Sequence, residues 1–391
     1  MPTRPSSSRL TRSAVLVATE HAASDSVGAN DDATVVVGTD AAPERAAGAD
    51  SFERRVRTKL APGLLGAIPW SAIFPDFAND GRVVNPATGA AREFSLTALR
   101  ESVYVPPGAK GRAPLLFVEG ANQWLEVGGT RARRHADRLG LPMAVVHNPS
   151  FVREVGAQPR PLKSLHRMLE GASNLVLHGG HFTERAAINL AYAMVDALQR
   201  NEPTYFAGES QGSILVGHAL RNAHDAWVGA RTPVIGAEAA EREFQERASA
   251  SLFVLTFGNA WPSYPEGPNY LHLSIEGDPV PKDGSRPDNR PASDRRRYLI
   301  FERLFPGKDN FENHNIAFLN ELFARTCELN GIAPGDLGRV FKLVQRGSDG
   351  TGQPLRIATA ADVAWPDDMV EQLWDPARNQ ATVEGWALTS T

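Results

Sequence analysis

One serine in the chain has neighbours that favour nucleophilic chemistry. Ser210 lies in Gly208-Glu209-Ser210-Gln211-Gly212, directly after the short apolar segment 204–207 and before a segment with helical character. At a tight turn from strand to helix the serine hydroxyl is exposed, and glycines two residues before and after it remove side chains that would collide there. The start of the helix also presents backbone N–H groups to a developing anion. We therefore predict that Ser210 is a nucleophile.

A serine hydroxyl needs a general base and an acid that orients the base. Asp278 follows the predicted strand 270–275, at the sheet edge where parallel sheets assemble ligand chemistry. His314 is the one histidine of ten that follows Asp278, which is the order expected after such a serine. We predict His314 as the base and Asp278 as the acid. The alternatives are a turn aspartate and a histidine that caps or packs a helix, with Glu276 and Asp283 as rival acids.

An oxyanion site needs two N–H donors. One is expected from Gln211, the residue after the nucleophile. The other is expected from the loop 119–124, which follows an earlier buried strand and contains Gly120, a residue that lets the backbone bend closely. Ala121 or Asn122 is the predicted donor. Because the donor is a backbone group, the side chain at either position does not decide between them.

The elements that must position these residues alternate between strand and helix. The expected strands are 101–105, 114–119, 143–147, 204–207, 251–257 and 270–275. The expected helices are 126–139, 182–199, 211–227 and 311–329. Such alternation predicts an α/β fold with a mostly parallel central sheet and helices on both faces, over residues 95–330. A small hairpin of 341–345 with 355–358, followed by a tail packed on the domain, is expected within 331–391.

The N-terminal part of the chain differs in composition from the rest. Residues 1–50 are rich in Ala, Ser, Thr, Asp and Gly and contain no aromatic residue. Such a segment buries too little apolar area to offset its ordering entropy, so we expect disorder, either as a flexible tail or as an export signal. Residues 51–94 follow as an apolar lead segment with several prolines. It is expected to pack on the domain or to form a flap over a substrate entrance.

Charge and composition exclude several classes of protein. The net charge of −4 gives no attraction to nucleic acid, and Arg295-Arg296-Arg297 is expected in a solvated loop. The sequence contains no run of 18 apolar residues, so no membrane span is predicted. The single Cys327 excludes an intramolecular disulfide framework and a cysteine metal cluster. No cofactor is expected. His178 and His181 lack a third metal ligand at useful spacing. The expected location is the cytoplasm, or outside after export without a cleaved signal.

These motifs together resemble the α/β-hydrolase superfamily, and among its members the lipases and esterases most. The resemblance covers about residues 95–330. It rests on the turn at 208–212, the strand end Thr256-Phe257-Gly258, the acid loop Gly277-Asp278-Pro279-Val280-Pro281 and the late His314. The chain departs from these enzymes before the nucleophile, where lipases often carry histidine and this chain has Glu209.

The resemblance implies a serine hydrolase that cleaves a carboxylic ester through an acyl-enzyme. It assigns Ser210 as nucleophile, His314 as base and Asp278 as the acid that holds the imidazole. An acyltransferase with the same triad and a non-catalytic binding or effector protein of this fold are the alternatives.

Aromatic residues on loops at the same sheet edge suggest the substrate. Trp124, Trp261 and Tyr264, with Phe151 and Pro262, are expected either to form an apolar acyl or alcohol site or to pack in the core. An apolar site with a flap favours a small-molecule or lipid ester over a peptide. The sequence does not specify the oligomeric state.

Overall fold

The computed structural model describes residues 78–120, 125–149, 185–261, 263–280, 296–305, 311–346, 354–367 and 369. Several predictions lie outside these residues. They concern the tail 1–50, most of the lead segment 51–94, Ala121, Asn122, Trp124, Phe151, Pro262, His178, His181 and Asp283.

The fold is a mixed α/β arrangement around one eight-stranded sheet with the strand order β2-β1-β4-β3-β5-β6-β7-β8. The strands are β1 Val83–Val84, β2 Ala91–Arg92, β3 Leu115–Val118, β4 Met143–Val146, β5 Thr204–Glu209, β6 Leu252–Phe257, β7 Asn269–Ile275 and β8 Arg296–Phe301. Strands β4, β3, β5, β6, β7 and β8 are parallel, and β1 pairs antiparallel with both β4 and β2. The predicted mostly parallel sheet is confirmed.

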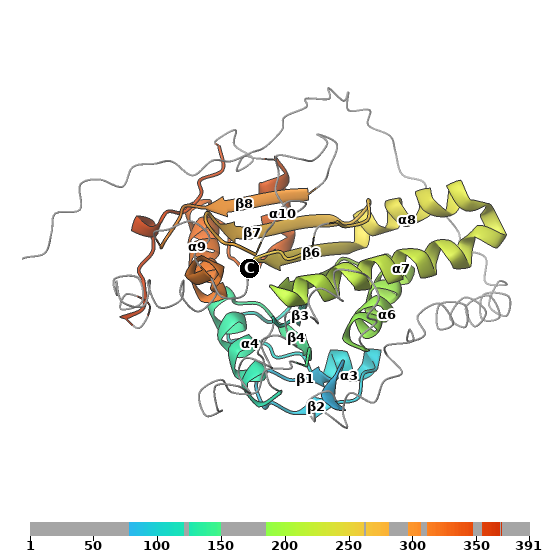
Figure 1. Ribbon diagram of the computed structural model, residues 1–391, viewed down its shortest axis with the longest axis horizontal. Helices are drawn as coiled ribbons and strands as arrows, with labels where there is room; N and C mark the ends of the chain where they lie inside the picture. Colours follow the sequence, from blue (N-terminus) through green and yellow to red (C-terminus); the bar gives the residue numbers. More distant parts are fainter. Residues whose placement is uncertain are drawn as a thin grey trace, which may run out of the picture.

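Helices cover both faces of this sheet (Figure 1). They are α3 Leu96–Glu101, α4 Leu125–Leu139, α6 Arg185–Arg200, α7 Gln211–Ile235, α8 Ala237–Ser251, α9 Ile316–Leu329 and α10 Leu337–Arg346, with short 3-10 turns η4 Phe311–His314 and η5 Ala360–Asp362. Buried residues of α6, α7 and α8 pack with one face of the sheet, and those of α4, α9 and α10 pack with the other. Because both faces are covered, β3 and β4 are buried at every position and read as continuous apolar runs.

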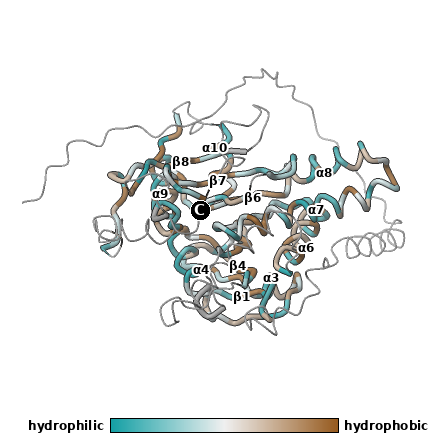
Figure 2. Tube along the Cα trace, viewed as in Figure 1, coloured by the Kyte–Doolittle hydropathy of each residue, from teal (hydrophilic) through white to brown (hydrophobic). Residues whose placement is uncertain are grey.

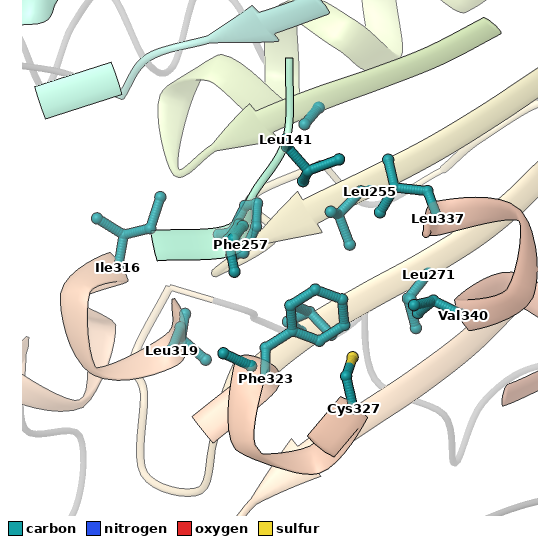
Figure 3. Packing of buried hydrophobic residues seen from close by; sticks show 14 of the residues in the cluster. Leu141, Leu255, Phe257, Leu271, Ile316, Leu319, Phe323, Cys327, Leu337 and Val340 are labelled. Atoms are coloured by element: carbon teal, nitrogen blue, oxygen red, sulfur yellow. The ribbon is translucent and has the colours of Figure 1, made fainter. Parts of the chain in front are cut away.

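The core on the α9 side of the sheet is built from residues of α9, α10 and the strands beneath them (Figure 3). Phe323 and Cys327 of α9 lie against Leu271 of β7, and Leu337 and Val340 of α10 complete the layer. Burial raises the pKa of the Cys327 thiol to about 12. The cysteine is therefore a small apolar core residue and an unreactive one.

The sheet begins before residue 95, the start that we predicted for the domain. Asp80 accepts hydrogen bonds from the backbone N–H groups of Arg185 and Ala186 at 2.8 and 3.2 Å. It thereby satisfies the first amides of α6 from more than a hundred residues away. Asn189 of α6 donates to the carbonyl of Gly81 at 2.9 Å. These contacts lead the chain directly into β1.

Three predicted strand assignments are wrong. Residues 355–358 form no strand, because the amides of Arg356 and Ala358 bond the side chains of Asn330 and Thr326. Residues 101–105 form no strand, because Ser95 caps a helix at 96–101 by accepting from the Ala98 amide. An isolated bridge at Tyr104 is all that remains of the prediction. The predicted hairpin strand 341–345 is part of helix α10, whose buried positions Leu337, Val340, Phe341 and Val344 follow helical spacing.

Strand β8 and helix α8 are among the elements that were not expected from the sequence. Arg296 and Arg297 begin strand β8 and do not lie in a solvated loop. Helix α8 also escaped prediction because it is mostly polar, with Ala240, Phe244 and Ala248 buried at four-residue spacing.

Helices α7 and α8 run antiparallel and extend beyond the sheet as a long pair (Figure 1). Hydrophobic (brown) and hydrophilic (teal) residues alternate along this pair, as expected for helices with one buried side (Figure 2). Among the described residues, none of the helices has the length and apolar character that crossing a membrane requires.

Candidate active site

The turn at Ser210 has unusual backbone geometry. Ser210 joins β5 directly to α7 and has φ 49° and ψ −118°. Residues with a side chain rarely adopt this combination, and such strain persists only where the surroundings enforce it. Ser210 donates its backbone N–H to the carbonyl of Phe257 at 2.9 Å, which ties the turn to the end of β6.

The two glycines that flank the turn are required by close backbone contacts. A Cβ atom at Gly208 would lie 2.6 Å from the backbone of Gly212, and one at Gly212 would lie 2.3 Å from the carbonyl oxygen of Val118. No side chain fits at either distance. The glycine spacing read from the sequence therefore has the steric origin that the prediction assumed.

Ser213 holds the turn from inside α7. Its hydroxyl donates to the Ser210 carbonyl at 2.5 Å and accepts from the Ala260 amide at 2.8 Å. Ser213 is fully buried. One side chain thus connects the strained turn with the loop that follows β6.

His314 and Asp278 form a direct pair. The Nδ1 atom of His314 lies 3.0 and 2.9 Å from the two carboxylate oxygens of Asp278. Asp278 is 4 % exposed, and its Oδ1 also accepts from the Val280 amide at 2.9 Å. The Nε2 atom of His314 is buried and has no hydrogen-bond partner within the described part of the chain. The pair thus has the arrangement of a base held by an acid, with its second nitrogen available.

The end of β6 joins this pair to Ser210. A Cβ atom at Gly258 would lie 2.3 Å from Cε1 of His314 and 3.3 Å from a carboxylate oxygen of Asp278, so glycine is needed for the imidazole to fit there. The preceding residue, Phe257, accepts the N–H of Ser210. Ser210 and the His314–Asp278 pair therefore contact consecutive residues at one strand end.

Buried amides fix the segment that carries His314. Asn313 is fully buried and its Oδ1 accepts from the backbone amides of Leu304 and Phe305 at 3.2 and 3.1 Å. Asn315 caps α9 by accepting from the Ala317 amide at 3.0 Å. The histidine lies between these two anchors, so its backbone has little freedom to move away from Asp278.

The rival acid Glu276 lies elsewhere. Its carboxylate pairs with Arg303 at 3.4 Å, and its side chain is 63 % exposed.

Of the predicted oxyanion donors, Gln211 lies in the part of the chain that the structure describes. It is the first residue of α7 and is 4 % exposed. Ala121 and Asn122 remain predictions.

Two carboxyl groups lie beside the turn at the ends of neighbouring strands. Glu119 follows β3 and Glu209 ends β5, and Arg131 of α4 approaches Glu209 to 3.5 Å. Glu119 is 2 % exposed, and neither of its carboxyl oxygens has a hydrogen-bond partner in the described regions. Burial raises the pKa of Glu119 to about 8, and the charge of Glu209 adds to the rise, whereas Arg131 opposes it. Glu119 is therefore a neutral acid at pH 7.

Trp261 and Tyr264 are core residues. They are 2 % and 5 % exposed and belong to the cluster that packs α6 and α7 on the sheet. Trp261 lies against His218, with ring centroids 4.5 Å apart, and Tyr264 donates to Asn259 at 2.7 Å. Of the two expected roles, these contacts favour packing over a substrate surface. The role of Trp124 remains a prediction.

Sequence reasoning missed the buried polar residues that support the turn. Asn148, Ser213 and Asn313 are at most 1 % exposed and bond to the segments that carry the predicted residues. A sequence signal existed only for Asn148, a polar residue directly after the predicted strand 143–147. In the described ranges, no group of three or more His, Cys, Asp or Glu residues is arranged to hold a metal ion.

The fold and site define a mixed α/β protein with a strained serine and a histidine–aspartate pair at the carboxyl edge of its sheet. No family model and no curated protein matches the chain. Similar solved structures include an S-formylglutathione hydrolase from Agrobacterium tumefaciens, at 16 % identity over 56 % of this chain and 85 % of that one, with a TM-score of 0.21. A likeness at this level does not establish a shared fold or activity.

Proposed function

We propose that this protein is a serine hydrolase of the α/β-hydrolase type that cleaves a carboxylic ester. The observation that carries the proposal is the strained backbone of Ser210 between two sterically required glycines. The Ser210 amide bonds the end of β6, and His314 and Asp278 pack against the same strand end. A binding protein has no evident need to maintain this backbone strain beside a histidine–aspartate pair.

The proposed reaction proceeds in two halves. The Ser210 hydroxyl attacks the ester carbonyl carbon while Nε2 of His314 takes its proton, and the resulting oxyanion accepts from the Gln211 amide. Collapse of this intermediate breaks the ester bond, and the leaving alcohol receives the proton from Nε2. Water then attacks the acyl-enzyme with the same histidine as base, which releases the acid and restores Ser210. Asp278 accepts from Nδ1–H and stabilises the imidazolium throughout.

The substrate proposal is a small-molecule or lipid ester. Arg131 and Glu209 pair at 3.5 Å beside the turn, which lessens the attraction of either for a charged substrate. A neutral acyl ester is therefore the proposed class.

A fluorophosphonate probe tests this proposal with the full-length chain. We expect the probe to label the protein and Ser210→Ala to abolish both labelling and hydrolysis of a p-nitrophenyl ester. Ser249→Ala is the matched control, because Ser249 lies on α8 and bonds a helix carbonyl. Unchanged labelling of Ser210→Ala would refute the proposal. Products formed with an added acceptor alcohol would separate hydrolysis from acyl transfer.

A further inference from the structure

Asn148 joins three elements beneath the candidate active site. It comes two residues after the end of β4 and is 1 % exposed. Its Nδ2 group donates to the carbonyl oxygen of Glu119 at 3.2 Å and to Oε1 of Gln211 at 3.0 Å. One amide group therefore connects the end of β3 to the first residue of α7.

These two acceptors belong to the two segments that are predicted to supply oxyanion donors. Gln211 carries the proposed donor N–H on its own backbone. Glu119 directly precedes Gly120, where the loop with the second predicted donor begins. The contact between the two segments is already tight, because Gly212 lies against the carbonyl of Val118. The side chain of Asn148 thus spans the same junction as this backbone contact.

Simple packing does not account for an asparagine at this position. Its Oδ1 atom is buried without a hydrogen-bond partner in the part of the chain that the structure describes. An unsatisfied buried acceptor costs free energy that an apolar side chain of similar volume avoids. The two bonds from Nδ2 must therefore provide something that packing alone does not.

We propose that Asn148 is a positioning residue, which fixes the place of the proposed oxyanion donor Gln211 by holding it against the end of β3. This inference rests on the proposed function. Oxyanion donors act only within about 2.7–3.1 Å of the developing charge. A small displacement of Gln211 therefore weakens the stabilisation of the transition state. It leaves the binding of the uncharged ester almost unchanged.

The test compares steady-state kinetics of full-length variants on one p-nitrophenyl ester. Asn148→Ala is expected to lower kcat about 10- to 100-fold, less than or comparable to the loss of one donor, with KM within about twofold. Asn269→Ala is the matched control. Asn269 is also a buried amide that donates to a backbone carbonyl, that of Ser249 at 2.7 Å, but it begins β7 at the opposite edge of the sheet. It is expected to keep the wild-type kcat.

A double-mutant cycle shows whether Asn148 acts through its partner. Gln211→Ala keeps the backbone N–H and removes Oε1, so the double variant is expected to lose less than the product of the two single losses. Asn148→Leu has a similar size and lacks the donor, and it replaces Asn148→Ala if that variant fails to fold. A kcat equal to that of Asn269→Ala, or a change confined to KM, would overturn the inference. Failure of the proposed function is recognised separately, by full activity in Ser210→Ala.

Discussion

The two ends of strand β5 carry the two non-glycine residues with positive φ in the described part of the chain, yet their surroundings differ. Asn201 precedes β5 with φ 53°, and Ser210 follows it with φ 49°. Asparagine adopts this region readily, and Asn201 stands directly after the last residue of α6, where such a conformation ends a helix. Ser210 has no comparable local reason for its geometry. The difference separates an ordinary chain reversal from strain held at a candidate site.

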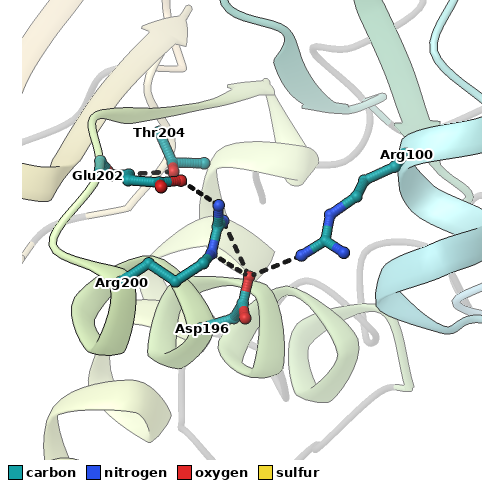
Figure 4. A network of polar contacts seen from close by, with 5 residues as sticks. All are labelled: Arg100, Asp196, Arg200, Glu202 and Thr204. Atoms are coloured by element: carbon teal, nitrogen blue, oxygen red, sulfur yellow. Dashed lines mark hydrogen bonds and ion pairs between the residues drawn. The ribbon is translucent and has the colours of Figure 1, made fainter. Parts of the chain in front are cut away.

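Polar groups at the two ends differ in the same way. At the amino end, Asp196 lies 2.9 Å from Arg200 and 3.6 Å from Arg100, and Arg200 also pairs with Glu202 (Figure 4). The Thr204 hydroxyl donates to the carbonyl of Glu202, so the residue that pairs with Arg200 also bonds the first residue of β5. At the carboxyl end, the two carboxyl oxygens of Glu119 and the Nε2 atom of His314 have no hydrogen-bond partner among the described residues. The charged groups at the amino end pair with one another, whereas the carboxyl end retains polar groups that a reaction can use.

Replacing each positive-φ residue by glycine gives the largest expected contrast. Ser210→Gly removes the proposed nucleophile and relieves the strained backbone. Ester hydrolysis should fall by on the order of 10⁴-fold or more, while the free energy of unfolding rises by about 1 kcal/mol. Asn201→Gly should leave the rate unchanged and shift stability by only a few tenths of a kcal/mol, because asparagine is already tolerated there.

Urea unfolding and ester kinetics on both variants check this contrast. Loss of stability in Ser210→Gly would mean that the serine is not strained, and loss of activity in Asn201→Gly would mean that the two ends are not functionally distinct.

The acid at the carboxyl end can be distinguished from its exposed rival. Asp278→Asn removes the charge that stabilises the His314 imidazolium and favours the wrong tautomer, so kcat should fall by about 10⁴-fold. Glu276→Gln removes only a surface pair with Arg303 and should leave kcat within about twofold. Comparable losses in the two variants would remove Asp278 from the proposed triad.

The neutral acid Glu119 should make stability depend on pH. Its pKa is raised from an ordinary value of 4.5 to about 8 in the folded protein, mainly by burial. Between these values the unfolded chain is ionised at Glu119 while the folded chain is protonated, so this group lowers stability as the pH rises from 4.5 to 8. Glu119→Gln abolishes this contribution. The variant should therefore gain stability over the wild type between pH 5 and pH 8, by up to a few kcal/mol.

Urea denaturation at pH 5 and pH 8 measures this gain, with Glu202→Gln as the matched loss of a carboxylate at the amino end. An equal difference between Glu119→Gln and wild type at both pH values would contradict a protonated Glu119.

Much of the fold followed from periodicity, and the exceptions have physical causes. The buried strands at 143–146, 252–257 and 269–275 were predicted within a residue or two, because strands covered on both faces are rich in apolar residues. Strand β8 was missed because it begins with two arginines. Residues 341–345 were assigned to a strand because five residues are too few to separate the two periodicities.

The candidate site was predictable where chemistry lies in the residue type and its order in the chain. Ser210, Asp278 and His314 were proposed on that basis, and the direct bond between the last two agrees with the proposal. Asn148 and Glu119 were not identified, because their importance comes from partners that only the folded chain brings near. A pairing between residues 63 positions apart, as in Asn148 and Gln211, leaves no local pattern in one sequence.

The smallest expected effect belongs to the ion pairs at the amino end of β5. A double-mutant cycle on Asp196→Asn and Arg200→Gln should give a coupling of less than about 1 kcal/mol, which falls further at high salt, because the Arg200 side chain is 39 % exposed. Neither variant should change kcat, since six residues of the neighbouring strand β6 already fix the register of β5. A fall in kcat of more than about fivefold would show that strain at Ser210 depends on how β5 is held at its other end. The two ends would then be coupled, and the backbone conformation of Ser210 would depend on contacts along the entire strand.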